Sequence, residues 1–258
     1  MEFIITLLDQ DINSWILAWL FFVVAFLYSS VGFGGGSSYL AILTLYGLAY
    51  ADLRFIALLC NIVVVSGSVI LYYRQGLYKA SMVLSLVILS VPMAFLGGMI
   101  KLDEKVFFII LAITLIFAAI LMWIPRNIDE RHVKSERHVS STLIGGGIGF
   151  LSGLVGIGGG IFLSPYLNLT KYDRVLRIAA FSSLFILVNS IAGILGQLTI
   201  GGELGDYTLV FMLVMAVFIG GQMGVRIGIK NLSPVWLKRI TALLIAIVGA
   251  RVLWIHLN

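Results

Sequence analysis

Tyr28-Ser-Ser-Val-Gly32-Phe-Gly34-Gly35-Gly36-Ser37-Ser38 is a run of small residues inside a charge-free segment, 12–51. The same pattern returns as Ser152-Gly-Leu-Val-Gly156-Ile-Gly158-Gly159-Gly160-Ile-Phe inside the charge-free segment 138–170. A bilayer core about 30 Å thick is crossed by roughly 20 helical residues. Both segments are therefore too long for one crossing, and the glycines predict a break within each.

The composition around these two segments is that of a membrane protein. The 258 residues are 60% hydrophobic and 11% charged, whereas soluble domains are about 45–50% apolar and about 25% charged. The net charge of +5 is small and scattered, which excludes a nucleic-acid binder with a clustered basic face. A single cysteine, Cys60, excludes an internal disulfide framework and multi-cysteine metal sites.

Six further apolar segments each have the length of one crossing. They are 55–73, 80–100, 106–125, 178–202, 207–225 and about 235–257. The chain is therefore expected to be an all-α integral membrane protein.

The two glycine patterns belong to a duplication of the chain. A constant spacing relates Phe26, Gly32 and the first triple glycine to Phe150, Gly156 and the second triple glycine. Further along the chain, Leu53-Arg54 corresponds to Leu176-Arg177. We expect four parts: an extracytoplasmic N-terminus at 1–11, a first membrane repeat at 12–125, a basic cytoplasmic linker at 126–139 and a second repeat at 140–258.

The positive residues indicate how the two repeats are oriented. Lys and Arg concentrate in short cytoplasmic loops. If each glycine-broken segment is a hairpin that enters and leaves on one side, 13 of the 17 Lys and Arg lie on one face, and only Arg54, Lys101, Lys105 and Arg251 on the other. If each segment crosses once, the best split of the 17 is 10 against 7. The hairpin reading predicts both termini outside and a second repeat inverted relative to the first. Whether the hairpins are re-entrant or fully spanning stays open.

Inverted repeats are typical of secondary transporters, with the binding site near the midplane where the repeats meet. Each repeat is expected to be a glycine-broken helical hairpin followed by three transmembrane helices. Within hydrocarbon, broken helices persist only where protein or a water-filled cavity surrounds them.

The glycine breaks themselves are the candidate binding site. Helices starting near Gly36 and near Gly160 direct unpaired N–H groups and positive dipole ends into the breaks. Glycine also lets a ligand approach the backbone, so the pattern favours an anion site. The candidate substrate-binding residues are Gly34, Gly35, Gly36, Ser37, Ser38, Gly158, Gly159, Gly160 and Ile161. The alternative is that the small residues only allow close helix packing.

Other polar residues lie inside or at the rim of the spans. Asn61 and Asn189 are further substrate-binding candidates, accompanied by several serines that include Ser190. Their alternative role is hydrogen bonding between helices. Arg54 and Arg177 occupy equivalent positions. One possible role is to recruit an anion. The role that we favour is interfacial, in contact with lipid phosphates or with the nearby Asp52 and Asp173. No catalytic or metal-ligating residue is predicted, because the centres of the spans contain no Asp, Glu or His.

The doubled Gly-x-Gly-Gly-Gly motif, the length and the basic central loop resemble the sulfite exporter TauE/SafE family of bacterial and archaeal membrane proteins. In the family a proline usually follows the last glycine by five residues; Pro165 fits that place, whereas Ala41 stands at the matching first-half position. The resemblance implies export, or in some relatives uptake, of sulfite, organosulfonates or related oxyanions across the inner membrane.

We therefore expect a secondary transporter that exports a small sulfur oxyanion, and not an enzyme. The alternatives are an importer of sulfonates coupled to protons or sodium, and an anion channel. No cofactor is expected. The expected partners are the anionic substrate and the lipid bilayer, with no nucleic acid, and a homodimer is left open.

Overall fold

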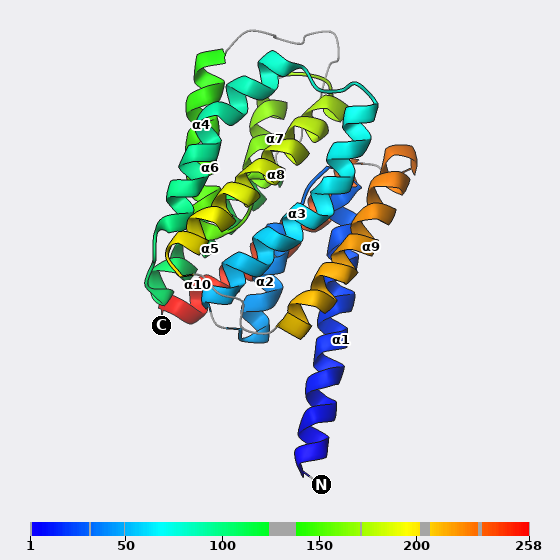
Figure 1. The fold of residues 1–258 in the computed structure, drawn as a ribbon, viewed down its shortest axis with the longest axis vertical. Helices are drawn as coiled ribbons and strands as arrows, with labels where there is room; N and C mark the ends of the chain where they lie inside the picture. The colour runs from blue at the N-terminus through cyan, green and yellow to red at the C-terminus, as the bar shows by residue number, and fades with distance from the viewer. Residues whose placement is uncertain are drawn as a thin grey trace.

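The structure is a computed structural model that describes residues 2–30, 32–48, 50–123, 138–170, 172–201, 207–231 and 234–257. Within these residues the fold consists of ten helices without a strand (Figure 1). In chain order they are α1 (Glu2–Ser29), α2 (Gly36–Tyr46), α3 (Tyr50–Arg74), α4 (Ala80–Met99), α5 (Glu104–Trp123), α6 (His138–Val155), α7 (Gly160–Leu169), α8 (Val175–Thr199), α9 (Tyr207–Asn231) and α10 (Pro234–Leu257).

Four helices contain stretches that are long and apolar enough to cross a membrane. These stretches are Asp52–Arg74, Glu104–Leu121, Leu176–Thr199 and Tyr207–Ile227, and shorter apolar stretches lie in α1, α4, α6 and α10. Large apolar side chains such as Ile113 and Phe211 are exposed on the outside of the bundle. An exposed apolar surface of this kind suits lipid, which confirms the predicted all-helical membrane fold.

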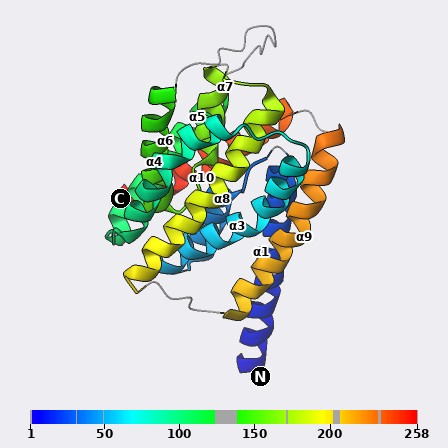
Figure 2. The same cartoon turned by 45° about the horizontal axis from the view of Figure 1, so that its top comes forward.

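The two halves of the chain contain corresponding elements that interlock. A long helix, a break, a short helix and three further helices occur in each half, as α1 to α5 and as α6 to α10. The contacts between halves are reciprocal: α1 packs on α9 as α6 packs on α4, α2 touches α10 as α7 touches α5, and α3 packs on α8 (Figures 1 and 2). Neither half therefore forms a separate body.

Glycines on α6 let it approach α4 closely. Three of them recur at every fourth residue and lie against the α4 backbone: Gly145 on Leu86, Gly149 on Ser90 and Gly153 on Ala94. The corresponding pair of helices uses the same device, because Gly220 and Gly224 of α9 lie against the backbone of α1. Small residues of this kind allow the backbones of membrane helices to touch.

Two elements lie near the predicted boundaries of the repeats. The first helix begins at Glu2 and so includes most of the predicted N-terminal segment 1–11. The linker predicted at 126–139 lies mostly outside the described residues, and α6 begins at His138. The two chain ends lie in the lower half of Figure 1, whereas the adjoining ends of α5 and α6 lie in its upper half.

Candidate functional site

Both predicted helix breaks are present, at the predicted residues. Helix α1 ends at Ser29 and α2 starts at Gly36, and α6 ends at Val155 and α7 starts at Gly160. The residues that cap the two short helices, Gly35 and Gly159, have φ angles of 92° and 78°. This left-handed conformation strains residues that have a Cβ, so the chain requires glycine at both caps.

The first N–H groups of each short helix have no backbone acceptor among the described residues. In α2 the first backbone bonds run from Ser38 N at 2.9 Å and Tyr39 N at 3.0 Å to Gly35 O, and in α7 from Phe162 N and Leu163 N, both at 3.1 Å, to Gly159 O. The N–H groups of Gly36, Ser37, Gly160 and Ile161 precede these bonds. They carry the positive end of each helix dipole.

Asn61 of α3 connects the two breaks. Its Nδ2 atom donates a 3.0 Å hydrogen bond to the carbonyl oxygen of Ile157, in the second break. The same amide lies against Gly34 and Gly36 of the first break, and a Cβ placed on Gly158 would lie 2.6 Å from Nδ2. Asn61 is 0% exposed. The two glycine breaks therefore meet at one buried amide and form a single site.

Two buried hydroxyls near the breaks have no hydrogen-bond partner among the described residues. Ser37 Oγ belongs to the first turn of α2, and Ser190 Oγ lies 3.1 Å from the position a Cβ on Gly158 would take. Both residues are 0% exposed. The neighbouring Ser38 differs, because its Oγ shares a 2.6 Å hydrogen bond with the hydroxyl of Tyr28.

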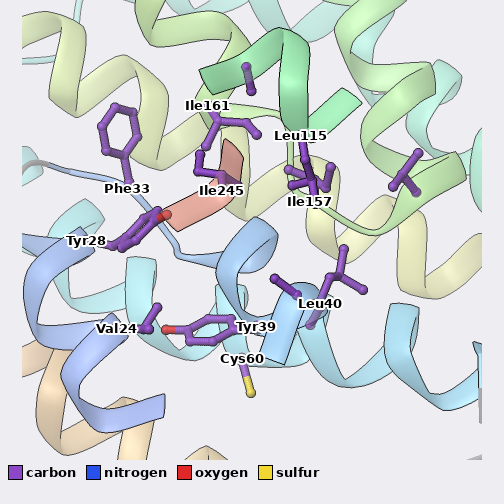
Figure 3. Packing of buried hydrophobic residues seen from close by; sticks show 14 of the residues in the cluster. Val24, Tyr28, Phe33, Tyr39, Leu40, Cys60, Leu115, Ile157, Ile161 and Ile245 are labelled. Carbon is purple, nitrogen blue, oxygen red and sulfur yellow. The ribbon is translucent and has the colours of Figure 1, made fainter. Parts of the chain in front are cut away.

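The other candidate glycines face apolar or aromatic side chains. A Cβ on Gly35 would lie 2.9 Å from the ring of Tyr39, and one on Gly159 would lie 2.9 Å from the ring of Phe185. Gly160 lies against Ile186. The side chain of Ile161 joins Ile157, Leu115 and Ile245 in the apolar cluster shown in Figure 3. A polar side-chain atom next to these glycines is the Tyr39 hydroxyl, 2.9 Å from the Cβ position of Gly35 and without a hydrogen-bond partner among the described residues.

Asn189 is not brought to the breaks by any described contact. Its Nδ2 atom donates a 2.8 Å bond to the carbonyl of Phe185, one turn earlier in the same helix. Its Oδ1 atom is buried without a partner. Asn61 and Asn189 therefore have unequal surroundings, although they occupy similar stretches of the two halves.

Arg54 differs from the interfacial role favoured by the sequence. It is 4% exposed, and its guanidinium donates to the carbonyls of Ile100 at 3.0 Å, Gly98 at 3.2 Å, Gly97 at 3.3 Å and Gly153 at 2.9 Å. The carbonyls at the end of α4 lack helical partners, and a guanidinium with five donors satisfies several at once. Arg54 therefore ties α3 to α4 and to the second half.

Arg177 contacts Asp173, one of the partners that its position predicted. Its Nη1 atom lies 3.4 Å from Asp173 Oδ2. Lys79 of the first half lies 3.8 Å from the same oxygen. The two equivalent arginines thus both stabilise contacts near helix ends, one through carbonyls and one through a carboxylate.

A cavity of about 530 Å³ lies elsewhere, among α5, α6 and α7. Its wall contains Ile110, Phe117, Leu151 and Phe162, with Thr114 and Tyr166 as the residues that carry a hydroxyl. The hydroxyl of Thr114 donates to the carbonyl of Leu111 at 2.7 Å. A wall that is mostly apolar is a poor site for an anion. The polar groups at the two breaks remain the candidate site.

Known proteins resemble this chain over nearly its whole length. The family described as "Sulfite exporter TauE/SafE" matches residues 17–252. A probable membrane transporter protein of Sinorhizobium fredii is 30% identical over 244 residues, which cover 92% of this chain and 97% of that protein. A probable membrane transporter protein of Methanocaldococcus jannaschii is 30% identical over 247 residues, covering 88% and 91%. No solved structure matches significantly.

Proposed function

Because the chain belongs to the sulfite exporter TauE/SafE family of membrane transporters, we propose that it exports a small sulfur oxyanion, such as sulfite or an organosulfonate. The observation that carries this proposal is the meeting of both glycine breaks at Asn61. The unpaired N–H groups of two helix starts and the hydroxyl of Ser37 supply donors to an anion without a buried positive charge.

The proposed architecture follows the duplication of the chain. Residues 12–125 and 140–258 are two repeats of inverted orientation, with both termini outside the cell and the basic linker in the cytoplasm. The reciprocal contacts between the halves support this arrangement. The site then lies where the repeats meet, as in other transporters built from inverted repeats.

Transport requires the buried site to open alternately to each side. Two sets of contacts between the halves are candidates for the closed gates. One is the bond from Arg54 to the carbonyl of Gly153, and the other is the ion pair between Lys79 and Asp173. We propose that one of these contacts breaks in each open state.

The membrane potential supports export over uptake. An inside-negative potential is worth about 2.3 kcal/mol per charge per 100 mV. At that voltage a monovalent anion is expelled by a factor of roughly 50 without a coupling ion. Uptake of the same anion requires a proton or sodium gradient.

Flux measurements in proteoliposomes test the proposal. The purified full chain is reconstituted, and the movement of sulfite, sulfoacetate, thiosulfate and chloride is followed under an imposed voltage. We expect saturable, voltage-driven movement of at least one sulfur oxyanion. Movement no faster than through protein-free vesicles would contradict the proposal.

Two further results distinguish the alternatives. Accumulation against the voltage that collapses when a proton or sodium gradient is removed indicates an importer. Single-channel currents without saturation or counterflow indicate a channel.

A further inference from the structure

We propose that the site selects an oxyanion that carries its own hydrogen-bond donor, and that Asn61 Oδ1 is the acceptor for it. The inference rests on the proposed function. It concerns a property of the site that helix starts and glycines do not provide, namely a fixed acceptor beside the donors.

The orientation of the Asn61 amide is determined by its partner. Nδ2 lies 3.0 Å from the carbonyl oxygen of Ile157, and a carbonyl only accepts hydrogen bonds. Turning the amide over would place two acceptors against each other, so Oδ1 must be the atom on the other side.

Oδ1 therefore faces the first break without a hydrogen-bond partner. It lies against Gly34, it is buried, and no described group donates to it. A buried acceptor without a partner is unfavourable, and the amide that carries this oxygen lies against Gly36 at the start of α2. An incoming ligand is the natural source of the missing donor.

A fully deprotonated oxyanion fits these groups poorly. Its oxygens accept from the N–H groups of Gly36 and Ser37, but any oxygen near Asn61 Oδ1 is repelled by the partial negative charge there. An oxyanion with one O–H group satisfies both sets of atoms, because its charged oxygens accept and its hydroxyl donates. Hydrogen sulfite has this form, whereas the sulfite dianion does not.

The choice of substrate is thus expected to depend on a donor close to the charged group. Sites built to hydrogen-bond a substrate group discriminate strongly against analogues that lack it, because the partner is left unpaired.

A pair of sulfonates of equal charge tests the inference. Methanesulfonate and hydroxymethanesulfonate each carry one negative charge, and only the second carries a hydroxyl. Both are used as inhibitors of sulfite flux through the purified full chain in proteoliposomes. We expect hydroxymethanesulfonate to inhibit at an at least ~10-fold lower concentration.

Substitutions then assign the effect to the amide. Asn61→Leu should abolish the difference between the two inhibitors. The matched control is Asn168→Leu. Asn168 is a buried amide like Asn61, and its Oδ1 likewise has no partner among the described residues. Its Nδ2, however, donates within its own helix, to Ser164 O at 2.8 Å. The control should keep the full difference.

Three results are decisive. Equal inhibition of wild-type flux by the two sulfonates overturns the inference but does not contradict the transport of sulfite. This comparison requires no variant. A difference that persists in Asn61→Leu also overturns it. An absence of sulfite flux in the wild type removes the proposed function and the inference together.

Discussion

Arg54 illustrates how one residue joins elements that are far apart in the sequence. Its guanidinium donates hydrogen bonds to the carbonyls at the end of α4 and to the Gly153 carbonyl of α6. Loss of the guanidinium leaves these buried carbonyls without donors, and each lost bond of this kind costs about 1–3 kcal/mol. We therefore expect Arg54→Met to lower the thermal unfolding temperature in detergent markedly, and Arg54→Lys to restore it only in part, since an ammonium lacks the planar fork.

The matched control is the equivalent residue of the other half. The side chain of Arg177 is 31% exposed, and its partner Asp173 keeps two other partners when Arg177 is removed, namely Lys79 at 3.8 Å and the backbone N–H of Arg174 at 2.7 Å. Arg177→Met should therefore shift unfolding little. Equal shifts for Arg54→Met and Arg177→Met would contradict the structural role of Arg54.

Gly35 combines a left-handed backbone with a close neighbour. An added Cβ would be strained at φ 92° and would lie 2.9 Å from the ring of Tyr39. Gly47 has a similar φ of 81° but open space around it. We expect Gly35→Ala to destabilise by about 1–3 kcal/mol more than Gly47→Ala, as overpacking does.

The measurement is thermal unfolding of the three proteins in the same detergent. Because Gly47→Ala reports the backbone strain alone, the difference between the variants isolates the contact with Tyr39. If both substitutions cost the same, the ring does not constrain the first break. Loss of flux in a valine variant at Gly35 would for this reason say more about folding than about the anion.

At the scale of elements, the α4–α6 contact depends on glycine spacing. A Cβ added to Gly149 would lie 2.7 Å from Ser90 Cα, whereas a Cβ added to Gly147, two residues earlier, would have nothing within 4 Å. Replacing either glycine by leucine gains about 0.8–1 kcal/mol of helix propensity. Gly149→Leu also forces the backbones apart, which costs about 1–3 kcal/mol or more.

We therefore expect Gly147→Leu to be neutral or slightly stabilising and Gly149→Leu to be clearly destabilising. Expression level and thermal unfolding of the purified variants check this. A stable Gly149→Leu protein would show that α4 and α6 do not pack through these residues.

The positions of the helix breaks could be predicted because their cause is local. Three consecutive glycines in a charge-free segment specify where α2 and α7 begin, and the structure confirms both starts. Ala41 in place of the family's proline does not alter this, since α2 and α7 contain 11 and 10 residues.

The partners of Asn61 and Arg54 could not be predicted in the same way. Both bind main-chain carbonyls, at Ile157 and at Gly153, that lie in the other half of the chain. A carbonyl gives no signal in the sequence, because every residue has one. For the same reason the sequence favours an interfacial role for Arg54, whereas the structure places the carbonyls at the end of α4 against its guanidinium.

At the scale of the whole molecule, the predicted orientation in the membrane depends on the side on which the two chain ends lie. Both chain ends lie in the lower half of Figure 1. The charge asymmetry predicts that the two ends lie outside, since 13 of the 17 Lys and Arg fall on the opposite face under the paired-hairpin topology.

Single cysteines labelled in intact cells test this orientation. The sole natural cysteine, Cys60, is buried, so a Cys60→Ala protein is the background. Cysteines added before Met1 and after Asn258 should react with a membrane-impermeant thiol reagent from outside, whereas a cysteine at Ser135 of the linker should react only after the cells are opened. Ends that react from opposite sides would contradict the paired hairpins, because one of the two broken segments would then have to cross the membrane once.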